Sequence, residues 1–129
     1  MRILVVTATD AEVAPLAEKL GDGSKSGPRM KTYKRAQHDI DVLTTGVGMV
    51  ATAAWCSGVL TQNRYDLAFN FGVCGSFNPA LELAQVVHVV SDRMAELGAE
   101  NDEVFLTLEQ LGLYDGDEFL FKRGQLLNL

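Results

Sequence analysis

Three turns in this sequence have the composition of ligand-binding turns, because glycine or small polar residues directly follow an apolar run. They span residues 7–9, 44–48 and 72–76. Small residues at the end of a buried strand let a ligand approach the backbone closely. If the three strands are parallel neighbours, the turns line one sheet edge. Together they would then present backbone N–H groups, hydroxyls and a helix N-terminus to a polar or anionic ligand.

Glu12 is a candidate for chemistry at that edge, because it falls in the first turns of a helix predicted at residues 11–20. Its carboxylate could point toward a ligand. It could equally serve as a favourable charge near the helix N-terminus, worth roughly 0.3–1 kcal/mol. Asp10 fits the same description, so the residues alone leave both the role and the choice of carboxylate open.

The turns do not match two common nucleotide-binding motifs. Gly46-Val47-Gly48 lacks the third glycine of the dinucleotide fingerprint, and the sequence has no Gly-Lys-Ser or Gly-Lys-Thr of a P-loop. The two cysteines, Cys56 and Cys74, are not spaced as a metal-binding or redox pair. We therefore expect no cofactor and no bound metal.

The predicted elements follow the order of an α/β protein. Helices are predicted at residues 11–20 and 48–63, with a shorter one at 107–113, and residues 21–28 are predicted to form a polar loop. The strand at 66–71 is apolar on both faces, which is typical of a central strand. The predicted strands span residues 2–7, 31–37, 39–44, 66–71 and 85–91, the second and third as a hairpin.

Charge and composition argue against several classes of protein. The 129 residues carry a formal net charge of −6, which disfavours nucleic acid or an anionic membrane surface as a partner. No stretch approaches the roughly 20 apolar residues of a membrane span. Met1-Arg2 leads straight into an apolar strand, unlike a signal peptide. We expect a single-domain cytoplasmic protein with reduced thiols.

Four segments follow one another along the chain: residues 1–9 with 12–16, 45–53, 66–77 and 89–100. Together they resemble the nucleoside phosphorylase/nucleosidase superfamily, and within it the futalosine hydrolases. The resemblance implies a three-layer α/β sandwich with a mixed, largely parallel central sheet. Family members are considerably longer, so it also implies that residues 1–129 are the N-terminal part of a single, truncated domain.

The resemblance implies an activity, the hydrolysis of the N-glycosidic bond of a purine-type nucleoside, with futalosine in menaquinone biosynthesis as the expected substrate. In this family Glu12 matches the acid that orients or deprotonates the nucleophilic water. Two turns match those that border the ribose and base pocket, and Ala8 of the first turn joins them. The expected substrate-binding residues are Ala8, Gly46, Val47, Gly48, Val73, Cys74 and Gly75.

Water is favoured over phosphate as the nucleophile. Phosphorylase relatives hold phosphate with the arginine and serine of an Arg-x-Gly-Ser pattern at the central strand. The matching positions here are Asn70 and Val73, which supply neither a positive charge nor a hydroxyl. A phosphate dianion without such partners is poorly compensated.

Other functions stay open at this point. One is a methylthioadenosine/adenosylhomocysteine nucleosidase, and another is a non-catalytic homologue that binds nucleosides or assembles with partners. The part of the family pattern that contacts the ribose hydroxyls and protonates the base has no match in residues 102–129, so we do not expect catalysis by this chain alone. The resemblance and an incomplete sheet both favour a homodimer. A doubly wound domain of unrelated function would be favoured if the three turns did not converge.

Overall fold

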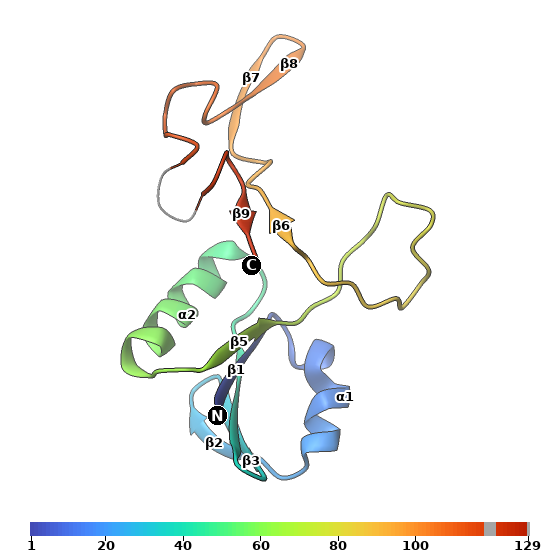
Figure 1. The fold of residues 1–129 in the computed structure, drawn as a ribbon, viewed down its shortest axis with the longest axis vertical. Coiled ribbons are helices and arrows are strands. Elements are labelled where there is room, and N and C mark those ends of the chain that lie inside the picture. The colour runs from blue at the N-terminus through green and yellow to red at the C-terminus, as the bar shows by residue number, and fades with distance from the viewer. Residues whose placement is uncertain (118–120, 129) are drawn as a thin grey trace. The chain divides into compact units, whose positions relative to one another are not determined.

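The computed structural model describes residues 1–117 and 121–128. The chain divides into two compact units, Met1–Phe77 and Asn78–Leu129. The first unit is an α/β sheet with two helices, and the second consists of short paired strands and turns (Figure 1). The assignment of residues 1–129 to one larger domain stays a prediction.

The first unit contains a mixed five-stranded sheet in the order β2-β3-β4-β1-β5. The strands β4, β1 and β5 run parallel, whereas β2, β3 and β4 are antiparallel neighbours. The predicted hairpin is therefore confirmed, as are both long helices. The elements are β1 (Arg2–Thr7), α1 (Asp10–Leu20), β2 (Ser24–Gly27), β3 (Met30–Arg35), β4 (His38–Thr44), α2 (Met49–Gln62) and β5 (Leu67–Asn70).

The two helices cover opposite faces of this sheet, as Figure 1 shows. Successive side chains of a strand point to opposite faces, and β1 is apolar at both sets of positions. Val5 packs with Val13 of α1, while Leu4 and Val6 pack on the other face against Trp55 of α2. The α/β prediction is confirmed. The packing of the helices on the two faces of the sheet holds the end of β1 and the start of α1 in position.

The prediction for residues 66–71 as a central strand is wrong for this structure. β5 pairs with β1 on one side only and forms the sheet edge, and Phe69 is 42% exposed. Residues 85–91 were expected to add a further buried strand, but Ser91 alone belongs to one and Val86 is 94% exposed. The apolar composition of these segments predicts burial, yet burial requires a neighbouring layer that the described residues do not supply.

Two smaller predictions are also corrected. The glycine-rich residues 21–28 contain β2, because Lys25 pairs across from Lys31 of β3. The helix expected at residues 107–113 is replaced by turns. The second unit contains β6 (Ser91–Asp92), β7 (Gly98–Asn101), β8 (Val104–Thr107) and β9 (Leu126–Leu127), paired as β6 with β9 and β7 with β8.

A membrane span requires a helix of a certain length and apolar character. Within residues 1–117 and 121–128, neither helix is long and apolar enough to cross a bilayer.

Substitutions of Gly48, which precedes α2, and of Gly58, which lies within it, are expected to have opposite effects on stability. Gly48 precedes the helix with φ of 102° and ψ of 153°, a region that is essentially restricted to glycine. Gly58 lies within the helix, and an added Cβ there would meet nothing within 4 Å. We expect Gly48→Ala to destabilise the chain by about 1–3 kcal/mol, and Gly58→Ala to stabilise it by up to about 1 kcal/mol. Denaturant unfolding of the two variants measures both, and equal effects would contradict the strained conformation of Gly48.

Candidate active site

Glu12 is held at the N-terminus of α1 by its own helix. The helix begins after Thr9, and Glu12 is its third residue, so the side chain can fold back over the first turn. The Thr9 backbone N–H donates to Glu12 Oε2 at 2.8 Å. This contact is the helix-capping role that the sequence left open as the alternative to catalysis.

Glu12 also makes contacts that capping does not require. The Thr7 hydroxyl at the end of β1 donates to Oε2 at 3.1 Å, and the Thr9 hydroxyl donates to it at 3.2 Å. Oε1 accepts one longer hydrogen bond, 3.4 Å from the Val73 N–H that follows β5. Oε2 therefore has three donors, whereas Oε1 keeps lone pairs for a further donor such as a water molecule.

The hydrogen bonds around Glu12 favour its ionised form. The Thr9 N–H contributes most to lowering the pKa of Glu12 below its ordinary value. Partial burial opposes this shift, and the hydroxyls of Thr7 and Thr9 and the Val73 N–H add to it. Glu12 is thus a carboxylate at neutral pH, the state that a general base needs.

The three turns converge, as they must if β4, β1 and β5 are parallel neighbours. Beyond the strands, the Thr45 N–H donates to Thr7 O at 2.8 Å and the Gly46 N–H donates to Ala8 O at 3.0 Å. The Phe71 N–H donates to Val6 O at 2.8 Å on the other side of β1. The sheet pattern continues into the turns and places them side by side at one edge.

Glycine at position 72 lets the third turn pass close to Glu12. A Cβ built on Gly72 would lie 3.4 Å from Glu12 Oε1 and a larger side chain would press on it. Oε1 therefore faces the backbone of Gly72 and Val73, at the edge where open α/β sheets bind ligands.

The structure brings only some of the predicted site residues to Glu12. Val73 contacts it directly, and Ala8 and Gly46 are bonded to each other in the neighbouring turns. The remaining predicted residues are exposed near the start of α2 or after Val73, and no contact joins them to Glu12 among the described residues. They are Val47, Gly48, Cys74 and Gly75.

Asp10, the other candidate carboxylate, is engaged elsewhere. The Thr44 hydroxyl donates to Asp10 Oδ1 at 2.6 Å. Asp10 lines a groove of about 560 Å³ between α1 and the β3–β4 face, together with Val13 and Tyr33. Glu12 is not among the residues that line this groove, so the two carboxylates lie at different sites.

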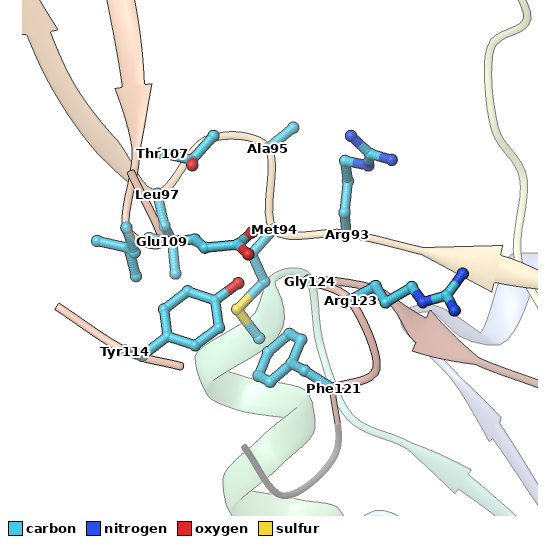
Figure 2. A pocket seen from close by; sticks show the side chains of 11 residues that line it. Arg93, Met94, Ala95, Leu97, Thr107, Glu109, Tyr114, Phe121, Arg123 and Gly124 are labelled. Atoms are coloured by element: carbon cyan, nitrogen blue, oxygen red, sulfur yellow. The ribbon is translucent and has the colours of Figure 1, made fainter. Parts of the chain in front are cut away.

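The second unit has a cavity of its own, of about 410 Å³. Figure 2 shows Met94, Tyr114 and Phe121 along it, and the two rings lie 5.3 Å apart. None of the predicted site residues lines this cavity. Four of its lining residues, Arg93, Met94, Ala95 and Leu97, fall in the segment 89–100 that carries part of the family resemblance, but the sequence analysis predicted no site residue there.

Thr7 is the contact residue that sequence reasoning did not single out. It lay within the first turn, yet a threonine at the end of a strand has no distinctive pattern. The signal was its position five residues before Glu12, which lets a strand-end hydroxyl meet a carboxylate in the first helical turn.

The fold and this edge define an α/β protein whose glycine turns and anchored carboxylate lie at the ends of parallel strands. A family model described as "Phosphorylase superfamily" matches residues 2–119. The chain belongs to this superfamily, as the sequence resemblance predicted.

Curated proteins similar to this chain carry nucleosidase names. A futalosine hydrolase of Acidothermus cellulolyticus is 32% identical over 85% of this chain and 44% of its own length. An aminodeoxyfutalosine nucleosidase of Campylobacter jejuni is 25% identical over 99% of this chain and 55% of its length. A 5′-methylthioadenosine/S-adenosylhomocysteine nucleosidase of Colwellia psychrerythraea is 28% identical over 67% of this chain and 37% of its length. The chain thus spans about half the length of the curated relatives it matches.

Proposed function

We propose that this chain carries the water-activating part of a nucleoside N-ribohydrolase that cleaves a purine-type nucleoside, namely futalosine in menaquinone biosynthesis. The observation that carries the proposal is the anchoring of Glu12. Three donors hold Oε2, while Oε1 faces the Gly72–Val73 backbone at the ligand edge. The names of the relatives support the substrate class.

In the proposed reaction, Glu12 acts as the general base. A water molecule attacks the anomeric carbon of the ribose and gives a proton to Glu12 Oε1. The electron pair of the broken C–N bond leaves with the nucleobase, and the nucleobase takes up a proton. A carboxylate also stabilises the positive charge that develops on the ribose in such a transition state.

Release of free base from futalosine tests this function. The assay is run on the purified 129-residue chain and on the longest protein that its gene encodes, with 5′-methylthioadenosine and S-adenosylhomocysteine as alternative substrates. If either alternative nucleoside is cleaved faster than futalosine, that nucleoside is the substrate in place of futalosine. If neither form of the protein releases base from any of these nucleosides, the proposed activity is wrong.

Phosphate is expected to have no effect on the reaction. Asn70 and Val73 occupy the positions at which phosphorylase relatives place a phosphate-binding arginine and serine, and neither carries a positive charge or a hydroxyl. We expect an unchanged rate of release of the nucleobase when inorganic phosphate is added, and the free sugar with its 5′ substituent as the second product. Formation of the 1-phosphate of that sugar, detected by mass spectrometry, would contradict this prediction.

A nucleoside-binding or assembly module is the second candidate. The observation that favours it is that four of the predicted substrate-binding residues are exposed and make no contact with Glu12 among the described residues: Val47, Gly48, Cys74 and Gly75. Calorimetry with futalosine separates the two candidates, because binding without base release supports the module.

We also propose that the chain forms a homodimer in the cytoplasm. Exposed apolar side chains on α2 and β5 support association, among them Val50, which is 84% exposed, and Leu60 and Leu67. Analytical ultracentrifugation tests the dimer, and a monomer across the micromolar range would exclude it.

A further inference from the structure

Contacts within the sheet hold Thr7 in place independently of Glu12. Thr7 is fully buried at the last position of β1 and pairs with Thr44 of β4. Its backbone carbonyl accepts a hydrogen bond from the Thr45 N–H at 2.8 Å, and the Thr45 hydroxyl lies 3.2 Å from the same oxygen. The sheet therefore determines where the hydroxyl of Thr7 lies.

That hydroxyl has one proton and two acceptors within reach. Thr9 O and Glu12 Oε2 each lie 3.1 Å from Thr7 Oγ1. A hydroxyl donates only once, and a hydrogen bond to a charged acceptor is stronger than one to a neutral carbonyl. The proton therefore goes to Glu12 while Glu12 is ionised, and it is shared between Glu12 Oε2 and Thr9 O when Glu12 is neutral.

We propose that Thr7 is a positioning residue for Glu12, whose hydroxyl holds Oε2 so that Oε1 is the oxygen that receives the proton of the attacking water. The inference rests on the proposed function, in which Glu12 is the base. When Oε1 takes that proton, the charge on Oε2 disappears and the Thr7 proton can turn to Thr9 O. No buried polar atom loses its partner in either state, which keeps the carboxyl group in place through proton transfer.

The charged groups near Glu12 have other partners. Asp10, in the same turn of α1, accepts its hydrogen bond from Thr44, and Arg29 lies over the ring of Trp55 at 5.5 Å. The segments from β1 and after β5 contribute Thr7 and the Val73 N–H, which are uncharged. In residues 1–117 and 121–128, the ion pairs are Arg2–Asp41 and Lys34–Asp39, so none involves Glu12. Neutral donors set the position of this carboxylate.

The test is an NMR titration of the Glu12 side-chain carboxyl carbon in the 129-residue chain. Thr7→Val keeps the shape of the side chain and removes its proton, whereas Thr7→Ser keeps the hydroxyl. We expect the pKa of Glu12 to rise in Thr7→Val and to stay near the wild-type value in Thr7→Ser. A residue that only fills space would leave the pKa of Glu12 unchanged in Thr7→Val, and that result overturns the inference.

A measurement on the unmodified chain covers the case in which Thr7→Val does not fold. The methyl carbon of Thr7 should shift with the same midpoint as the Glu12 carboxyl, because the hydroxyl turns between acceptors as Glu12 titrates. A Thr7 methyl signal without that inflection overturns the inference. Neither readout needs turnover, so a chain that fails to release base disproves the proposed function without deciding the role of Thr7.

Discussion

Glu12→Gln is expected to lower the turnover of nucleoside hydrolysis by roughly 10²–10⁴-fold, the usual contribution of a general base. The amide keeps the size of the side chain and can still accept the Thr9 N–H and the Thr7 hydroxyl through its oxygen. It cannot take a proton from water at neutral pH. The loss should therefore fall on kcat, with KM nearly unchanged, because the removed interaction acts in the transition state.

A matched control comes from the same helix. Glu18 is exposed on α1, so Glu18→Gln removes the same charge far from the ligand edge and should leave kcat unchanged. Equal losses of kcat and of nucleoside affinity in Glu12→Gln would show that Glu12 mainly binds substrate. Loss of stability alone would assign it to helix capping, the role that its 2.8 Å bond from the Thr9 N–H already supports.

The sequence predicted the first unit well because its signals are local. Val5 and its neighbours in β1 are apolar at both alternating sets of positions, and the first helix carries an apolar face at helical spacing. It failed at β5 and at residues 85–91 for a different reason. Apolar composition indicates a preference for burial, but only long-range pairing decides whether a layer covers the segment.

The candidate site was predictable in part. Glu12 stood out as a carboxylate beside glycine turns, and the parallel order β4-β1-β5 brought those turns together as anticipated. Its helix-end location, however, fits both capping and catalysis. The choice between the roles depends on which oxygen is free, and that follows from the hydroxyl of Thr7 and the N–H of Val73. No sequence pattern encodes these distances.

Asp41 had no signal in the sequence, although it forms the most connected side-chain cluster of the first unit. Its side chain is fully buried on β4 and accepts bonds from Arg2 Nη2 at 2.8 Å, from the Tyr65 hydroxyl at 2.8 Å and from Thr32. These partners stand 39, 24 and 9 residues away in the chain. The cluster ties β1, β3 and β4 to the turn that leads into β5.

The cluster fixes the ionisation of its members. Burial raises the pKa of Asp41, but the hydrogen bonds from Thr32, Tyr65 and Arg2 outweigh it and bring the pKa below its ordinary value. Burial and the bond to Asp41 raise the pKa of Tyr65 to about 12, so Tyr65 remains a donor at neutral pH. Folding thus favours ionised Asp41. Its stabilising effect is complete above the unfolded pKa of about 3.9 and is lost as the pH falls through the lower folded value.

Asp41→Asn should therefore destabilise the chain by roughly 3 kcal/mol at neutral pH, because it removes the charge that Arg2 pairs with in a buried site. Asp39→Asn is the matched control on the same strand. It removes an exposed pair with Lys34 and should cost less than about 1 kcal/mol. Urea unfolding at pH 7 and at pH 2 measures both, because the contribution of ionised Asp41 is lost only below the unfolded pKa of about 3.9. The variant Asp41→Asn should lose less stability than the wild type between these two pH values, since its amide does not titrate. A cost no greater than that of Asp39→Asn would show that the Asp41 cluster does not stabilise the sheet whose edge holds Glu12.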